Sequence, residues 1–433
     1  MELRTRTLGD ICDDAGGEIK TGPFGSQLHQ SDYSENGTPV VMPKNIIDGT
    51  VSVADIARIA DQHVERLSQH CLKVGDIVYG RRGDIGRHAL IKSREDGWLC
   101  GTGCLRITAG NGELQPNFLH YYLDQDDVKG WILNQAVGAT MPNLNTTILR
   151  SVPVTYPSRE SQRKIAAILS AYDDLIENNL RRIKILEEIA QNLYREWFVK
   201  FRFPGHANVR MVDSPLGKIP EGWEIVSIDD VATVHRGRSY RSKDLVDDGG
   251  LPFVNLKCID RDGGFRRNGL KRYVGKYKET QKVVSGDIVM AVTDMTQERR
   301  IVARAGRVPT LDSDFGVISM DLVKIEPREG ISPDYLYGYF RGSDFADNVK
   351  QQANGANVLH LSPDRIKEYQ FVLPSKVMRD RFTAFSGLVF KDVENLNRRN
   401  EILRKTRDLL LPKLISGELD VSELEINTGK KAA

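Results

Sequence analysis

Residues 116–122 read Pro-Asn-Phe-Leu-His-Tyr-Tyr, and residues 333–339 read Pro-Asp-Tyr-Leu-Tyr-Gly-Tyr. The second stretch lies 217 residues after the first, and the same displacement carries Pro157 to Pro374. A constant displacement over so long a span indicates an internal repeat, in which each copy is one structural unit. The chain is therefore expected to contain two copies of one fold.

Earlier in each copy the displacement is smaller. Gly75-Asp76-Ile77-Val78 matches Gly286-Asp287-Ile288-Val289 at 211 residues, and Pro39 matches Pro252 at 213. Such drift indicates insertions, which accumulate in surface loops. Short apolar runs between glycine and aspartate turns predict strands, so we expect each copy to begin with a mixed α/β region.

Each copy ends in a long predicted helix with apolar residues at alternating steps of four and three, the spacing of a coiled-coil seam. The two helices are expected to pack together, with Asn179 and Asn400 as polar residues that fix the register. Arg407 interrupts the second seam, so less regular packing is expected there. The predicted seam residues are Ile165, Leu169, Tyr172, Ile176, Asn179, Ile183, Leu186, Leu193, Val389, Val393, Leu396, Asn400, Leu403 and Leu410.

These patterns predict five segments in a chain of 433 residues. The first globular domain covers 1–157, the first long helix 158–203, the second domain 204–375, the second helix 376–418 and a C-terminal tail 419–433, loose from Thr428. The expected fold class is mixed α/β, with two repeated globular domains separated by the pair of long helices.

The composition is that of a globular protein, with 40% hydrophobic and 28% charged residues. The sequence has no apolar run of about 18 residues and no apolar leader after Met1, so a cytoplasmic location is expected. Five scattered cysteines complete no zinc site, and no phosphate-loop, zinc-protease, hydrolase-elbow or dinucleotide motif is found. We expect neither catalysis nor a metal or other cofactor in this chain.

Positive charge instead gathers in one stretch. Residues 257–282 hold nine Lys or Arg against three Asp or Glu, with Tyr273 and Tyr277 among them, a composition typical of a phosphate-binding surface. Glycine-rich stretches at 20–27 and 235–240 occupy similar places in the two copies and can bring Arg or Gln to base edges. The candidate DNA-contacting residues are Lys20, Thr21, Gly22, Phe24, Gly25, Ser26, Gln27, Lys44, Arg81, Arg82, Arg236, Arg238, Ser239, Tyr240, Lys257, Arg266, Arg267, Lys271, Arg299 and Arg300.

Four stretches resemble one known family. They are 157–170 (Pro-Ser-Arg-Glu-Ser-Gln-Arg-Lys-Ile-Ala-Ala-Ile-Leu-Ser), 186–198, 220–223 (Pro-Glu-Gly-Trp) and 409–419. Together with the repeat, they make the chain similar to the specificity subunits of type I restriction-modification systems over essentially its full length. Residues 372–382 are a poorer copy of the first helix entry.

This resemblance implies two target recognition domains, related by a pseudo-two-fold axis and held apart by an antiparallel pair of helices. Each domain would read one half of a split double-stranded DNA target, and the helices would measure the unread spacer. It also implies two modification subunits, which bind S-adenosylmethionine and methylate adenine N6, and restriction subunits, which use ATP and Mg. A different interpretation of the same patterns is a structural adaptor, in which a coiled coil carries globular ends that bind proteins rather than DNA.

Overall fold

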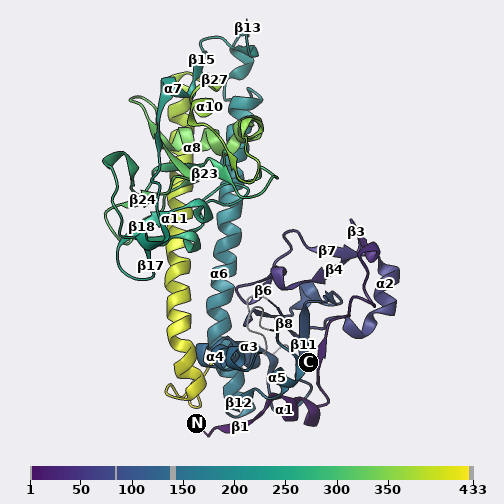
Figure 1. Ribbon diagram of the computed structural model, residues 1–433. Helices are drawn as coiled ribbons and strands as arrows, with labels where there is room; N and C mark the ends of the chain where they lie inside the picture. The colour runs from purple at the N-terminus through teal and green to yellow at the C-terminus, as the bar shows by residue number, and fades with distance from the viewer. Residues whose placement is uncertain (1, 83–84, 137–142, 429–433) are drawn as a thin grey trace. The chain divides into compact units, whose positions relative to one another are not determined.

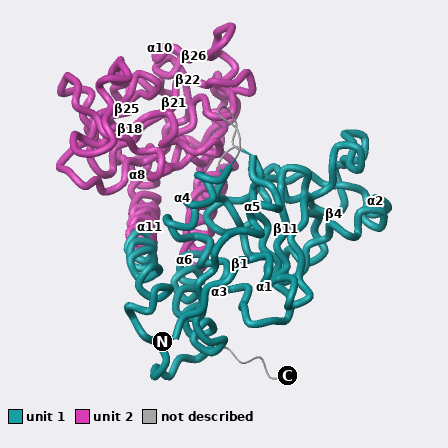
Figure 2. The backbone as a smooth tube through the Cα atoms, turned by 60° about the horizontal axis from the view of Figure 1, so that its bottom comes forward, with its two compact units in different colours: residues 1–177, 401–433 teal, residues 178–400 magenta. Residues whose placement is uncertain are grey.

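The computed structural model describes residues 2–82, 85–136 and 143–428. It divides into two compact units, coloured separately in Figure 2: unit 1 holds residues 1–177 and 401–433, and unit 2 holds residues 178–400. Of the tail expected to be loose from Thr428, residues 429–433 lie outside the described part. Each unit contains helices and sheets, so the predicted mixed α/β class is confirmed. The division into five segments stays a prediction.

Unit 1 is built on an antiparallel sheet with the strand order β2-β11-β8-β9, of which Figure 1 labels the neighbouring strands β11 and β8. Its central strand β8 follows the predicted Gly75-Asp76 turn and is buried at all four positions. Ile77 and Tyr79 pack in one core cluster and Val78 in another, so both faces of the strand are covered. The strands are β2 (Glu18–Thr21), β11 (Cys104–Thr108), β8 (Ile77–Gly80) and β9 (His88–Leu90).

Unit 2 repeats this sheet with the order β16-β25-β21-β23. The strand β21 follows Gly286-Asp287 and is likewise buried throughout, with Met290 in one cluster and Val289 in another. The strands are β16 (Ala232–Arg236), β25 (Leu322–Pro327), β21 (Ile288–Ala291) and β23 (Ala305–Arg307).

A second sheet in each unit contains a parallel strand pair. In unit 1, β4 (Thr38–Val41) runs parallel to β10 (Leu99–Cys100), and in unit 2, β18 (Leu251–Val254) runs parallel to β24 (Gly316–Ile318). The loops that follow the carboxyl ends of a parallel pair meet at one edge of the sheet, which is where α/β proteins place ligand-binding residues. This edge is the starting point for the candidate site.

One further helix packs beside the sheet in each copy. These helices are α3 (Pro116–Asp124) in unit 1 and α8 (Pro333–Gly342) in unit 2, and both begin with the proline of the repeated motif. Proline suits the first turn of a helix because its missing N–H has no helical partner there. The repeated motif therefore marks the start of the same helix twice.

The two long helices are α6 (Arg159–Tyr194), which continues as a π-helical turn over Arg195–Val199, and α11 (Lys376–Ser416). In unit 2, Asn179 contacts Asn400 while Tyr194 contacts Phe382. Residue numbers thus rise along α6 as they fall along α11, so these segments run antiparallel. All the predicted seam residues are buried or half-buried.

No helix in 2–82, 85–136 or 143–428 is both long and apolar enough to cross a membrane. Over the same ranges, no group of three or more His, Cys, Asp or Glu side chains is placed to hold a metal ion.

Candidate nucleic-acid interface

The carboxyl end of the parallel pair in unit 1 is covered by the glycine loop. Gly22 N donates to Cys104 O at 2.9 Å. A Cβ atom at position 22 would lie 2.0 Å from Gly101 O, so only glycine allows this approach. Gly101 N in turn donates to Val41 O at 2.9 Å. Three loops are therefore held together by backbone contacts.

Unit 2 makes the same contacts at repeat-equivalent positions. Gly237 N donates to Leu322 O at 3.2 Å, and a Cβ at 237 would lie 2.0 Å from Ser319 O. Ser319 N donates to Val254 O at 2.8 Å. Gly22 was predicted to contact DNA, which stays a prediction; in the structure, Gly22 and Gly237 allow the loops to approach one another closely. We call residues 22–27, 42–44, 81–82 and 101–103 the first loop cluster, and 237–240, 255–257, 292–294 and 319–321 the second.

One predicted lysine stands at the same place in each loop cluster. Lys44 lies in the 3-10 turn Pro43–Asn45 after β4, and Lys257 in the turn Leu256–Cys258 after β18. Both are exposed, and neither forms an ion pair with any residue that the structure describes. Their positions differ by 213, the displacement that relates Pro39 to Pro252.

The loop after β2 presents an aromatic ring to solvent. Phe24 is 55% exposed, and Gln27 Oε1 accepts a hydrogen bond from Phe24 N at 3.0 Å, which orders the turn. Gly25 and Ser26 are exposed between them. Lys20 and Thr21, the predicted residues before the turn, have partners within the protein. Lys20 Nζ lies 3.6 Å from Glu18 Oε2, and Thr21 O accepts a hydrogen bond from the ring of His70.

His70 itself is buried, and this burial lowers its pKa.

The side chain of Arg81 is hydrogen-bonded within the protein, whereas that of Arg82 faces solvent. Arg81 Nε donates to Asn143 Oδ1 and to Leu144 O, both at 3.1 Å, so its side chain supports the chain beside β8. Arg82 is exposed. Leu144 N donates to Arg81 O at 3.0 Å, and the equivalent bond in unit 2 joins Leu361 N to Val292 O at 2.8 Å.

The corresponding predicted residues of unit 2 also differ in how exposed their side chains are. Arg236 and Ser239 are exposed, whereas Arg238 is half-buried and its backbone N donates to Ile318 O at 2.7 Å. The ring of Tyr240 packs edge-on against Phe253 at 4.8 Å, and burial raises its pKa. Arg236 and Ser239 are therefore the accessible members of this group.

Most of the basic stretch is free to meet an anion. Three of its nine cations are ion-paired: Arg267 with Glu394, Arg272 with Asp312, and Lys282 with Glu279. The other six are exposed and have no acidic partner within the described chain; they are Lys257, Arg261, Arg266, Lys271, Lys276 and Lys278. Arg266 N donates to Cys258 O at 2.7 Å, which places this part of the stretch beside the turn of Lys257.

The loop between β21 and β23 is six residues longer than its counterpart between β8 and β9. Asp294, only 5% exposed, holds it by accepting from Thr296 N at 2.8 Å and Ile301 N at 3.3 Å. The predicted Arg299 adopts a left-handed φ of 55° and donates to Gln351, while Arg300 pairs with Asp262 at 3.3 Å.

The change in displacement from 211 to 217 predicted an insertion, and the structure places six residues in this loop, but Asp294, which holds the loop, was not predicted.

The long helices carry both buried polar contacts and exposed apolar side chains. In unit 1, Asp173 accepts from Tyr121 Oη at 2.6 Å and pairs with Arg407 at 2.5 Å. In unit 2, Asn179 Nδ2 donates to Asn400 Oδ1 at 2.8 Å. The exposed apolar residues of α6 and α11 are Leu175, Leu180, Ile185, Ile189, Val377, Phe385, Leu388, Ile402 and Leu409.

Comparison with known proteins identifies the family. The model of the type I restriction modification DNA specificity domain matches residues 2–189 and 220–389. The chain belongs to this family. It therefore carries two DNA specificity domains, one in each copy of the repeat, and the family resemblance expected from the sequence is confirmed. Specificity subunits are the non-catalytic components of type I systems.

Relatives of the family match along most of the chain. The specificity subunit of the type I restriction enzyme MjaIX from Methanocaldococcus jannaschii is 25% identical over 431 residues, covering 97% of this chain and 94% of the relative. That of HindI from Haemophilus influenzae is 21% identical, covering 81% and 88%. A crystal structure of a type I S subunit from M. genitalium has a TM-score of 0.54 at 15% identity, covering 96% of each chain, and shows a shared fold.

Proposed function

We propose that this specificity subunit recognises a split DNA target, with one loop cluster on each half-site, and directs partner adenine-N6 methyltransferase and restriction subunits to it. The observation that carries the proposal is the repeated loop cluster. Each cluster joins the carboxyl end of a parallel strand pair to an exposed, unpaired lysine, Lys44 or Lys257. Two equivalent sites in one chain suit two half-sites in one duplex.

The chemistry of each cluster fits a duplex. Cations such as Lys44, Lys257 and Lys271 neutralise phosphates whatever the sequence, and these contacts position the protein. Exposed side chains that differ between the copies, such as Phe24 in one and Ser239 in the other, are suited to reading base edges. Equivalent cations with unlike neighbours are what two different half-sites require.

The helices supply the spacer and the partner surface. A 36-residue helix such as α6 is about 54 Å long, enough to cover an unread stretch of duplex. Apolar side chains exposed in numbers on a soluble chain mark protein interfaces, and both long helices carry them. The two methyltransferase subunits dock on these faces. S-adenosylmethionine, ATP and Mg are held by partner subunits in this proposal, and none by this chain.

The deciding experiment sequences methylated adenines in DNA from cells that hold the cognate modification subunit with or without this chain. We expect a split motif that is methylated only when the chain is present. Methylation of the same sites without the chain, or none with it despite a stable complex, would favour the structural adaptor.

A second experiment measures the salt dependence of DNA binding by the purified chain. Replacing Lys44 and Lys257 with alanine removes two phosphate contacts, so the slope of log K against log salt should fall by about 0.9 for each. Lys405→Ala, an exposed lysine of α11, is the control and should leave the slope unchanged. An unchanged slope in the double variant would show that neither Lys44 nor Lys257 contacts a phosphate.

A further inference from the structure

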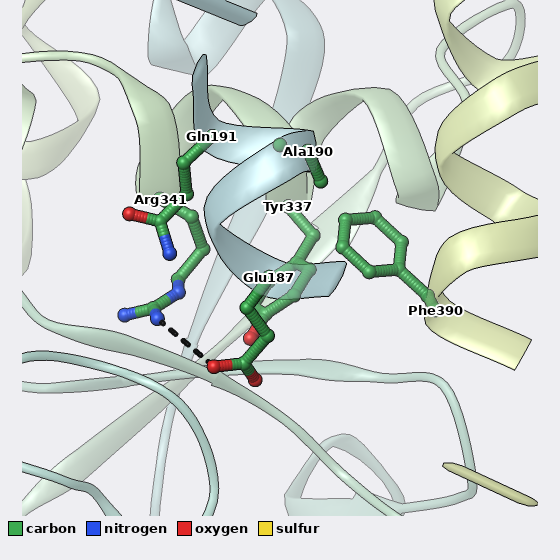
Figure 3. A pocket seen from close by; sticks show the side chains of 7 residues that line it. Glu187, Ala190, Gln191, Tyr337, Arg341 and Phe390 are labelled. Atoms are coloured by element: carbon green, nitrogen blue, oxygen red, sulfur yellow. Dashed lines mark ion pairs between the residues drawn. The ribbon is translucent and has the colours of Figure 1, made fainter. Parts of the chain in front are cut away.

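Arg341 ties the start of the basic stretch to α6. It lies on α8 with its side chain 10% exposed, and its Nη2 is 3.8 Å from Glu187 Oε2 on α6 (Figure 3). Its Nη1 donates to Asp262 O at 2.7 Å. The backbone of Gly263, with a φ of 84°, passes so close that a Cβ there would lie 2.0 Å from Nη1. Burial raises the pKa of Glu187, and the Arg341 charge opposes that shift.

Arg267 ties the middle of the basic stretch to α11. Its Nη2 pairs with Glu394 Oε1 at 2.5 Å, and its Nη1 donates to Thr310 O at 3.2 Å. Glu394 Oε1 also accepts from Thr310 N at 3.0 Å. The side chains of Arg267 and Glu394 are only 21% and 32% exposed. One arginine and one glutamate thus join a turn of the basic stretch, a loop and a helix.

Both contacts use the shape of arginine. A guanidinium is planar and presents several N–H groups in fixed directions, so it can bond two acceptors at once, whereas lysine presents a single point charge. Partly buried ion pairs add little net stability, since desolvation offsets the attraction. What two such contacts on two helices do supply is a defined orientation.

We propose that Arg267 and Arg341 are positioning residues that fix the DNA-facing stretch 257–282 on the α6 and α11 segments of unit 2, and so set the accepted spacer length. The inference rests on the proposed function. Arg267 is among the residues predicted to contact DNA, and its guanidinium bonds to Glu394 and to Thr310 O within the protein. Successive phosphates of one strand are about 3.4 Å apart along the duplex axis. A shift of this size in the stretch would change the spacer by one base pair.

The test combines Arg267→Lys with Arg341→Lys. This double variant keeps both positive charges and removes the two planar guanidinium groups, each of which can bond two acceptors at once. Methylated-adenine sequencing with the modification subunit should show the same two half-sites, now methylated also at spacers one base pair shorter or longer. Discrimination against the wrong spacers should fall about tenfold, equal to about 1.4 kcal/mol. The matched control is Arg365→Lys, an exposed arginine of unit 2 whose ion-pair partner, Glu368, lies only three residues away, and it should keep a single spacer.

A charge exchange, Arg267→Glu with Glu394→Arg, keeps an ion pair and tests the contact if the lysine variant melts early. It should discriminate better between spacers than Arg267→Glu alone. A single strict spacer in the folded lysine variant, or in Arg267→Glu, would overturn the inference, as would an altered half-site. Absence of methylation by the unchanged chain would instead overturn the proposed function.

Discussion

The equivalent helices α3 and α8 contact the long helices through different kinds of interaction. In unit 1, Tyr121 of α3 donates its hydroxyl proton to Asp173, which also pairs with Arg407. In unit 2, the equivalent position is Gly338, where a Cβ would lie 2.5 Å from the ring of Phe382. The first copy is attached through polar groups and the second through close apolar packing. A repeat therefore preserves where a helix lies without preserving what holds it.

The aromatic packing of unit 2 extends beyond one contact. Phe198 lies 5.4 Å from Phe382 and 5.8 Å from Tyr335, and Tyr194 lies 5.6 Å from Phe382, measured between ring centres. Such pairs add about 0.5–1.5 kcal/mol each beyond the area they bury. The end of α6 is thus part of the core of unit 2, so changes at α8 should be felt strongly there.

The largest effect is expected from filling the space at Gly338. Gly338→Leu forces Phe382 out of its position, and overpacking of this kind costs about 3 kcal/mol. Urea unfolding of the full chain measures it. Gly130→Ala, in the helix Asp126–Gln135 with no atom within 4 Å of the added Cβ, is the control and should be neutral or slightly stabilising. Equal results for the two variants would contradict close packing at α8.

A smaller loss should follow when the polar contact of unit 1 is broken. Arg407→Met leaves Asp173 with the hydroxyl of Tyr121 alone, and we expect a loss of about 2 kcal/mol, since the ion pair is only partly buried. Thermal unfolding provides the measurement, with Lys405→Met as the exposed control.

Adding Asp173→Asn should restore part of the loss, because no uncompensated charge then remains. A double variant less stable than Arg407→Met would contradict this account.

Acid should weaken unit 1 before unit 2. Burial lowers the pKa of His88, and burial with the nearby His88 and Arg407 lowers that of His120. The unfolded chain therefore binds protons first, and stability is lost as pH falls below about 6.5, by up to about 1.4 kcal/mol per pH unit for each histidine. The equivalent residues of unit 2 are Ala305 and Tyr337.

Hydrogen exchange between pH 5 and 7.5 distinguishes peptides of the two units. In His120→Phe the acid dependence of unit 1 should decrease. An equal dependence in both units would show that these histidines are not its source.

The smallest effect is expected at the asparagine pair of unit 2. Asn179 and Asn400 are buried, and Asn400 Nδ2 has no partner among the residues described. Replacing both with leucine should raise the free energy of unfolding by about 1 kcal/mol and loosen the helix register. Thermal unfolding and the methylated spacers measure the two effects. Asn192, exposed on α6, provides the control: Asn192→Leu should change neither the free energy of unfolding nor the methylated spacers. A double variant of Asn179 and Asn400 that is less stable than the unchanged chain would show that the pair stabilises the fold.

Much of the fold could be predicted because its signals are local. Gly286-Asp287 precedes a buried strand, and the alternating apolar spacing gives helices that carry Ile165 and Leu396 on their buried sides. Arg407 was expected to make the packing of the second seam less regular, which stays a prediction; the structure shows that its guanidinium pairs with Asp173 at 2.5 Å. That partner lies 234 residues away, beyond any local pattern.

The candidate site was predictable to the level of loops but not of side chains. Lys44 and Lys257 are accessible, as a phosphate contact requires, but so are many lysines in any sequence. Gly22 and Arg267 matched the pattern of DNA-contacting residues equally well. Their neighbours Gly101 and Glu394 are brought to them by strand pairing and helix packing.

By itself, the sequence determined that this protein is a twofold repeat with two long helices and a basic stretch, since period, displacement and charge are properties of the chain alone. Only the tertiary structure decided which cations of the basic stretch form ion pairs within the protein. Arg267 and Arg266 are adjacent in sequence, yet one is bound to Glu394 and the other faces solvent. The reason is physical: an ion pair depends on distances through space, and folding alone brings residue 394 to residue 267.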